Sequence, residues 1–345
     1  MRAITVRPGR PGSAELTEVP EPPRAEGAVL VEAVALGICG TDAEIVGGEY
    51  GEAPEGDERL VLGHESLGRV LEGAGGVEPG ELVVGIVRRP DPVPCHCCAR
   101  REPDFCRNGR FTERGIKGLH GFGRERWRVD PQDAVRVDEG LGLLGVLLEP
   151  ASVLAKAWEQ IERIRARSCE RTERVLVTGA GPIGLLAALL SAQRGLETHV
   201  LDQVTDGPKP ELVAGLGATY HASPVAEAAQ DGFDVVIECT GAPRVVLDAI
   251  TPRAPGGIVC LTGMSAGGDE LDVDVGELNR RMVLANHVVF GCVNANRRHY
   301  EQAAGALAAA ERGWLERLVT RRVPLARFDE ALERRDGDVK VVVEL

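Results

Sequence analysis

The pattern of hydrophobic positions changes near residue 150. Before that point, short β-branched runs such as residues 28–34 and 82–87 are separated by turns rich in Gly and Pro, which is typical of an irregular β domain. Beyond it, apolar runs of strand length alternate with helical stretches as far as residue 293. Such alternation predicts a parallel sheet with right-handed crossovers and helices on both faces. The pattern therefore predicts an α/β chain with a β-rich part and a Rossmann parallel-sheet part.

The alternating region allows its elements to be placed. Its expected strands are 175–177, 198–201, 235–237, 258–261 and 288–293, with a helix over 185–193. After this region come an Ala-rich helix near 301–312 and a closing apolar run at 339–343. We expect a β-rich domain over residues 1–151, a parallel-sheet domain over 152–293, and a C-terminal segment, 294–345, that returns to the first domain.

A glycine-rich turn follows the first strand of the parallel-sheet region. Gly179, Gly181 and Gly184 come directly after an apolar strand and directly before a helix. In this context the helix N-terminal amides around Pro182 and Ile183 can face a pyrophosphate. A glycine motif of this kind is weak evidence alone, because glycines also serve ordinary turns, but the strand before it and the helix after it favour a dinucleotide site.

Asp202 ends the next strand, where a carboxylate typically binds the ribose 2′-hydroxyl. Gln203 and Val204 follow it, and the nearest base, Lys209, lies beyond a Gly-Pro turn. Because an NADP site calls for a cation at this place, the acid predicts NAD in preference to NADP. Residues at two further strand ends are expected to line the nicotinamide half of the cofactor: Thr240, Gly241, Thr262 and Gly263.

A thiolate, an imidazole and two carboxylates occur in three separated, turn-rich fragments, as Cys39, His64, Glu65 and Glu149. This donor set suits zinc, and three protein ligands with one water position is the usual design of a catalytic zinc site. Cys39 and His64 are the expected ligands, while Glu65 and Glu149 compete for the third position. Taken singly, Cys39 and His64 would more often be core residues. Their occurrence together with the glutamates and the glycine turn favours a metal.

Two residues close to Cys39 are assigned supporting roles. Asp42 is expected to fix the tautomer of His64 as its outer partner, and Thr41 to take the alcohol proton and pass it outward. Zinc would act as a Lewis acid that lowers the pKa of a substrate hydroxyl, so that hydride can leave for a nicotinamide. These residues therefore predict the oxidation of an alcohol.

A cysteine-rich lobe, at about residues 88–110, suggests a second metal. Its four cysteines are Cys95, Cys97, Cys98 and Cys106. Four thiolates would close the coordination shell of a structural zinc. However, Cys97 is adjacent to Cys98, and neighbouring residues reach one tetrahedral ion only with a strained backbone. Asp91 or His96 could supply the fourth ligand instead, and a metal-free lobe is the alternative.

Composition narrows the class of protein. The formal net charge of −13 argues against nucleic-acid binding, which needs a cationic face. The sequence contains no run of about eighteen apolar residues, and its N-terminus lacks the apolar core of a signal peptide. We therefore expect a cytoplasmic protein with no membrane partner.

With these motifs, the sequence resembles the zinc-dependent medium-chain dehydrogenase/reductase superfamily over essentially its whole length. It is most similar to the microbial glucose dehydrogenases, through Arg88-Arg89-Pro90, an acid ahead of Gly115-Ile116, Glu149-Pro150 and a strand that ends in Val-Asn. The resemblance implies a GroES-like catalytic first domain and an NAD-binding second domain. It also implies that Glu113 and Asn294 hydrogen-bond sugar hydroxyls, and that the chain forms a homodimer or homotetramer.

The chain departs from these relatives at several positions. Relatives that use both cofactors carry arginines where this chain has Asp202-Gln203-Val204, and the first lobe cysteine of the family falls at Pro92. Some relatives also have further polar sugar contacts at three positions that are apolar here, Val87, Val153 and Leu284.

The leading hypothesis is a zinc- and NAD-dependent dehydrogenase of a sugar, cyclitol or related polyol. The three apolar positions leave open a zinc alcohol dehydrogenase for a less polar secondary alcohol. A hypothesis from another class is a zinc- and NAD-binding redox-sensing interaction protein.

Overall fold

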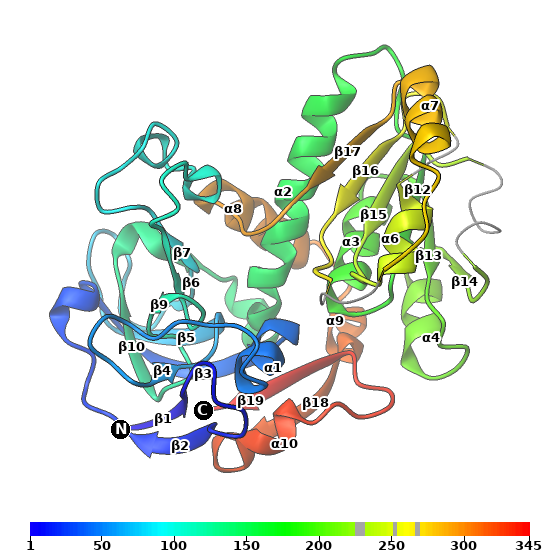
Figure 1. The fold of residues 1–345 in the computed structure, drawn as a ribbon. Coiled ribbons are helices and arrows are strands. Elements are labelled where there is room, and N and C mark those ends of the chain that lie inside the picture. Colours follow the sequence, from blue (N-terminus) through cyan, green and yellow to red (C-terminus); the bar gives the residue numbers. More distant parts are fainter. Residues whose placement is uncertain (225–231, 251–253, 266–269) are drawn as a thin grey trace. The chain divides into compact units, whose positions relative to one another are not determined.

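The computed structural model describes residues 1–224, 232–250, 254–265 and 270–345. The chain divides into two units, Met1–Ser152 with Asn294–Leu345, and Val153–Val293. Figure 1 shows the chain coloured along its sequence.

The first unit is built around a mixed sheet with the strand order β11-β6-β5-β3-β19-β18, in which β10 also pairs with β3. These strands are β3 (Val29–Ile38), β5 (Glu65–Glu72), β6 (Leu82–Gly85), β10 (Arg126–Val129), β11 (Ala134–Arg136), β18 (Val319–Pro324) and β19 (Lys340–Glu344). The long strand β3 is central because it pairs antiparallel with β5, β10 and β19. Its alternating buried positions, such as Val29, Val31 and Ala33, face a core that includes Phe122 and Trp127.

Two smaller sheets complete the strands of this unit. One has the order β2-β1-β4 and the other β7-β8-β9. Their bounds are β1 (Arg2–Val6), β2 (Glu15–Glu18), β4 (Leu60–Val61), β7 (Arg88–Arg89), β8 (Thr112–Arg114) and β9 (Gly118–Leu119). The helices are short: α1 (Gly40–Val46), α8 (Arg297–Ala308), α9 (Arg312–Leu318), α10 (Phe328–Leu332) and the 3₁₀ turns η1 (Arg24–Glu26), η2 (Cys98–Arg100), η3 (Pro103–Phe105), η4 (Pro131–Asp133), η5 (Glu139–Leu147) and η7 (Leu325–Arg327).

The second unit carries a parallel sheet whose described strands have the order β14-β13-β12-β15-β16-β17. They are β12 (Arg174–Thr178), β13 (Glu197–Leu201), β14 (Thr219–His221), β15 (Val235–Glu238), β16 (Ile258–Leu261) and β17 (Val288–Gly291). The helices are α3 (Pro182–Ala192), α4 (Pro208–Gly215), α6 (Pro243–Ala249) and α7 (Val275–Ala285), and α2 (Leu148–Arg165) runs across the boundary of the two units. The strand order steps outward from β12 in both directions, which places the carboxyl ends of β12 and β15 at a switch point where ligands bind.

The predicted elements agree with these strands in type and differ at some ends. The Ala-rich helix expected over 301–312 is wrong in its bounds: α8 spans Arg297–Ala308, and α9 begins separately at Arg312. Asn296 precedes α8 as its N-cap, and Glu311 caps α9 by accepting from the amides of the first turn. The expected single helix is therefore two helices, and the second begins after the cap at Glu311.

One helical stretch, Glu139–Arg165, has the length and composition of a membrane span. Most of its apolar window, 78%, is buried inside the fold. The core helix of a water-soluble domain has this property, because its apolar side chains pack against protein.

Candidate functional site

Two strand ends, the end of β3 and the start of β5, bring three of the predicted metal ligands together. Cys39 follows β3 and caps α1, and Glu65 is the first residue of β5, paired in register with Gly37. His64 directly precedes Glu65, and its Nε2 lies 3.0 Å from the Cys39 Sγ. Ligand atoms of Cys39, His64 and Glu65 all lie within 4.8 Å of one another. This convergence depends on Gly37, because a Cβ there would lie 2.0 Å from a carboxylate oxygen of Glu65.

The Asp42 carboxylate contacts both Cys39 and His64. One of its carboxylate oxygens accepts the backbone N–H of Cys39 at 3.0 Å, and the other lies 3.6 Å from Nδ1 of His64. Asp42 is buried, as is His64. The buried acid thus faces the ring nitrogen that does not face the thiol, as expected for the outer partner of a metal-binding histidine.

The electrostatics of this cluster suit a cation. Burial lowers the pKa of His64, but Cys39 and Asp42 together raise it well above the ordinary value. The site therefore attracts positive charge, as a proton in the metal-free protein or as a metal ion in its place. A thiolate, an imidazole and a carboxylate converging at this distance fit zinc.

Glu149 lies in the first turn of α2 and is buried, but it does not belong to the group of three converging ligand atoms. The pKa of Glu149 is raised to about 7, mainly by burial and also by the nearby Glu65, although His64 lowers it. Glu149 is therefore close enough for the charges of His64 and Glu65 to change its pKa. Thr41 is half-buried in the first turn of α1.

Sequence reasoning missed a buried lysine at this cluster. Lys340 begins β19, is 1% exposed, and forms an ion pair with Glu65. It also donates to the carbonyl oxygen of Ile38 at 2.9 Å. A lone lysine in an otherwise apolar closing strand was the available signal, because a buried lysine needs a partner. The sequence alone could not identify Glu65 and Ile38 as the partners of Lys340, because they lie about three hundred residues earlier in the chain.

The residues that the resemblance assigned to the sugar also meet in the first unit. Asn294 donates to Oε1 of Glu113 at 2.6 Å, and the same oxygen accepts from Arg88 at 3.0 and 3.1 Å. Glu113 and Arg88 are buried on the paired strands β8 and β7. The guanidinium of Arg88 also lies 3.9 Å from the ring centre of Phe111. Arg88 therefore holds the Glu113 carboxylate in place.

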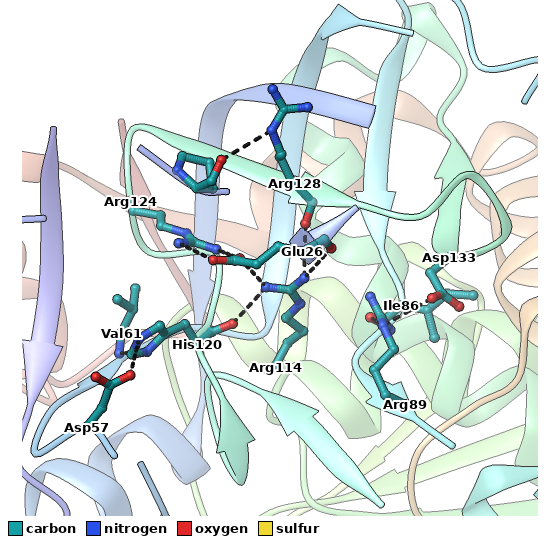
Figure 2. A network of polar contacts seen from close by, with 11 residues as sticks. Glu26, Asp57, Val61, Ile86, Arg89, Arg114, His120, Arg124, Arg128 and Asp133 are labelled. Carbon is teal, nitrogen blue, oxygen red and sulfur yellow. Dashed lines mark hydrogen bonds and ion pairs between the residues drawn. The ribbon is translucent and has the colours of Figure 1, made fainter. Parts of the chain in front are cut away.

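Figure 2 shows a network of buried arginines that includes Arg114, the residue after Glu113 in the chain. Arg114 donates to the Glu26 carboxylate at 3.0 Å and to the carbonyl oxygens of His120 and Arg128 at 3.1 and 3.0 Å. Arg124 forms a second ion pair with Glu26. By joining η1, β8 and β10, these contacts fix the strand that carries Glu113.

The glycine turn of the second unit requires its glycines for close packing. Gly179 has φ of +91°, a conformation that favours glycine. A Cβ at Gly184 would lie 1.8 Å from the carbonyl oxygen of Gly179. Pro182 begins α3, with Ile183 beside it, and Gly181 is its N-cap, so the free amides of the helix start stand at the turn.

Asp202 follows β13 and is tied to that turn. Its carboxylate accepts the Ala180 N–H at 2.7 Å and the Val204 N–H at 3.1 Å. Lys209, at the start of α4, lies 3.0 Å from the same carboxylate. The chain therefore turns back after Gly207-Pro208, so that Lys209 contacts Asp202.

A buried acid that the sequence did not single out organises the remaining cofactor residues. Glu238, fully buried at the end of β15, accepts from the Thr240 and Gly241 amides and from the Thr178 hydroxyl. Thr262 donates to the carbonyl oxygen of Glu238 at 2.8 Å. Gly263 packs so closely that a Cβ there would lie 2.2 Å from the Gly241 nitrogen. The ends of β12, β15 and β16 are thus joined at the switch point.

Three of the four lobe cysteines converge. Ligand atoms of Cys95, Cys98 and Cys106 lie within 4.8 Å of one another, and Cys97 does not join them. Cys97, Asp91 and His96 were the candidates left open for the fourth ligand, and none of the three joins the group.

Comparisons with known proteins extend over the whole chain. The family description "Alcohol dehydrogenase GroES-like domain" matches residues 25–139 and "Glucose dehydrogenase C-terminus" matches residues 142–345. Glucose 1-dehydrogenases of Thermoproteus tenax and Methanocella arvoryzae are 41% and 38% identical to the chain, each over 100% of it and 99% of the relative. The Haloferax mediterranei glucose dehydrogenase, solved in complex with NADP, Zn and gluconolactone, is 32% identical with a TM-score of 0.93, over 100% and 99% of the two chains.

These findings confirm the predicted fold class, with a Rossmann parallel sheet and a GroES-like domain. The expected preference for NAD over NADP gains no support, because the Haloferax relative was solved with NADP and because Lys209 supplies a cation at Asp202. The chain therefore belongs to the zinc-dependent medium-chain dehydrogenase/reductase superfamily, close to the glucose dehydrogenases.

Proposed function

We propose that this zinc-dependent dehydrogenase oxidises a hydroxyl of an aldose, with glucose as the first candidate, and transfers the hydride to a nicotinamide dinucleotide. The observation that carries the proposal is the convergence of Cys39, His64 and Glu65 within 4.8 Å, with His64 and Glu65 buried and Cys39 half-buried. The Glu113–Asn294 pair in the same unit adds the polar groups that a sugar needs.

In this proposal Cys39, His64 and one carboxylate hold the catalytic zinc. Zinc bound there would act as a Lewis acid that acidifies the substrate hydroxyl. Glu65 is the ligand that the geometry favours, because it belongs to the converging group and Glu149 does not. Asp42 orients the His64 ring through the 3.6 Å contact with Nδ1. Glu149 remains the nearby second carboxylate.

In this proposal Thr41 relays the proton of the substrate hydroxyl: its oxygen accepts that proton as its own hydroxyl proton passes to water. It follows the ligand Cys39 by two residues and stands in the first turn of α1, half-buried, so its hydroxyl can connect the buried cluster to water. Hydride then passes from the carbon that carries this hydroxyl to the nicotinamide. The helix start at Pro182 and the turn of Gly179 and Gly184 bind the cofactor pyrophosphate.

The sugar assignment rests on Glu113 and Asn294. The Glu113 carboxylate is oriented by Arg88, and carboxylate and amide groups held in this way suit recognition of vicinal hydroxyls. The relatives named glucose 1-dehydrogenase, and the gluconolactone in the Haloferax complex, support an aldose oxidised at its hemiacetal carbon. Buried hydrogen-bonding groups of this kind favour a polyhydroxylated substrate over a less polar alcohol, which would lie against them without making hydrogen bonds.

For the cofactor we propose that both NAD and NADP are accepted, with Asp202 and Lys209 sharing the recognition. The carboxylate can receive a ribose 2′-hydroxyl, and the lysine can turn to a 2′-phosphate. Replacing Lys209 with Met should raise the dissociation constant of NADPH by at least tenfold and change that of NADH little. Fluorescence titration of the two reduced cofactors measures this, and equal losses would refute the shared role.

A substrate screen on the zinc-loaded protein tests the main proposal. Aldoses, inositols and aliphatic alcohols are supplied with NAD or NADP, and reduced-cofactor absorbance is followed. We expect aldoses to give the highest kcat/KM. Cys39→Ser should lower turnover at least a hundredfold and remove one bound zinc, whereas Cys169→Ser, at an exposed cysteine, is the matched control. Full activity in Cys39→Ser would remove Cys39 from the site.

We further propose a cytoplasmic homodimer or homotetramer. Among the described strands β17 stands at the edge of its sheet, and α7 before it has no buried residue while exposing Val275, Val283 and Leu284. Exposed apolar side chains beside a free strand edge are typical of a subunit interface. Light scattering after chromatography tests this, with Leu284→Glu expected to yield monomers.

A further inference from the structure

A cavity in the first unit lies apart from the residues assigned to catalysis. Its volume is about 630 Å³, and its walls come from the Gly75-Gly76 turn, η4, β11, α8 and Arg101 of the cysteine-rich lobe. Sites for small molecules commonly have volumes of about 300–1,000 Å³. Of the described residues that line this cavity, none is assigned to the metal, the sugar or the cofactor. The cavity can therefore hold a ligand of its own.

The charges that line the cavity are mainly positive. Arg101, Arg136 and Arg297 line it, and Glu301 is the single acid among its described lining residues. The chain as a whole has a formal net charge of −13, so this cavity has the opposite sign to the rest of the protein. Cations that surround one cavity repel one another, and an anion placed between them removes that repulsion. The cavity therefore favours an anionic ligand.

Arg297 is held at the cavity wall by its neighbours. In the first turn of α8, its Nε donates to Glu301 at 2.9 Å. Its Nη1 lies within hydrogen-bonding distance of three carbonyl oxygens, those of Pro131, Gln132 and Ala134, at 3.3, 2.7 and 3.1 Å. A side chain that is already fixed loses little conformational entropy when a ligand binds. Arg297 is therefore a preorganised cation.

Arg101 differs from Arg297 because its guanidinium has no hydrogen-bond or ion-pair partner among the described residues. It is exposed and ends η2 with φ of +60°, a left-handed conformation that is uncommon for residues other than glycine. Strained backbone of this kind is often found at ligand sites. Arg101 therefore adds an unpaired cation to the cavity, available to an incoming anion.

The remaining lining residues indicate the kind of anion. Phosphate suits arginine, because the planar guanidinium donates two parallel hydrogen bonds to two phosphate oxygens. Of the lining residues that the structure describes, none is aromatic, so a nucleobase would find no ring on which to stack. The amide of Gln132 and the backbone of the Gly75-Gly76 turn offer donors and acceptors for hydroxyl groups. These features favour a phosphorylated sugar over a nucleotide.

We propose that this cavity binds a small sugar phosphate, with Arg101, Arg136 and Arg297 around the phosphate group. The sugar hydroxyls contact Gln132 and the Gly75-Gly76 turn. The bound molecule is a ligand distinct from the substrate, because the cavity shares no described residue with the cluster of Cys39, His64 and Glu65.

Calorimetric titration with fructose 6-phosphate tests the proposal. The zinc-loaded protein is first saturated with NADPH, so that the phosphate cannot enter the cofactor site. Fructose 6-phosphate should bind with a dissociation constant of about 1 mM or less, and fructose and inorganic phosphate should bind more weakly. The titration requires no turnover, so its result does not depend on which alcohol the enzyme oxidises.

Variants locate the bound ligand. Arg101→Met should raise the dissociation constant of fructose 6-phosphate by about tenfold or more, without lowering the melting temperature, because this side chain has no partner to lose. Arg334→Met, at an exposed arginine that does not line the cavity, is the matched control and should bind as the unaltered protein does. Equal affinity in Arg101→Met and Arg334→Met would place the ligand elsewhere. No binding to the unaltered protein, or equally tight binding of fructose or inorganic phosphate, would also overturn the proposal.

Discussion

Lys340 provides the sharpest test of how the metal cluster is held. Its side chain is 1% exposed and its partner Glu65 is 2% exposed, so the pair is out of contact with water. In Lys340→Met the apolar part of the side chain is kept and the charge is removed. Glu65 then remains as a buried carboxylate without its cation, and the Ile38 carbonyl loses its donor.

The expected cost follows from this burial. Removing one partner of a buried ion pair destabilises a protein by about 3–5 kcal/mol. For a unit of about 200 residues, each kcal/mol lowers the melting temperature by about 2–4 °C, so the metal-free protein should melt about 6–20 °C lower. Arg322→Met, at a half-exposed position on the neighbouring strand β18, is the control and should change stability by less than about 0.5 kcal/mol.

Zinc gives the experiment a second readout. If Glu65 is a zinc ligand, the metal supplies the positive charge that Lys340→Met lacks, so zinc should raise the melting temperature more in the variant than in the unaltered protein. Scanning calorimetry with and without zinc measures both. A melting temperature equal to that of Arg322→Met, or the same zinc-dependent rise in both proteins, would refute the reasoning.

Three further predictions concern other parts of the chain. Burial raises the pKa of Glu26, but Arg124 and Arg114 outweigh it and lower that pKa; Glu26→Gln should therefore melt lower at pH 7, and the gap should close as pH falls below about 4.5, where the unaltered carboxylate also loses its charge. A gap that does not depend on pH would contradict this. Gly184→Ala should abolish cofactor binding in fluorescence titrations, because its Cβ would overlap the Gly179 carbonyl; normal affinity would show that the turn can relax. Glu113→Gln should lower kcat/KM for the aldose by roughly 10- to 100-fold, as expected for a lost charged hydrogen bond, and an unchanged value would exclude a substrate contact.

Local sequence determined the elements that carry the chemistry. The strand, glycine turn and helix around Gly184 follow from residue order, because hydrophobic periodicity and the steric freedom of glycine act over a few residues. The same holds for Cys39 and His64, which stand at glycine-rich bends. Helix ends were predicted less well, as α8 shows: it begins at Arg297, ahead of the Ala-rich run, and a second helix begins after the cap at Glu311.

Tertiary structure alone decided which side chains meet. The pairing of β19 with β3 brings Lys340 to Glu65, and the path of the chain after β13 returns Lys209 to Asp202. In the lobe it selected three cysteines and left Cys97 aside. The sequence shows which cations, carboxylates and thiols the chain contains. The direction in which each of these side chains points depends on strand register and on the conformation of short turns. Those are set by the packing of segments far apart in the chain, and no local pattern of residues encodes them.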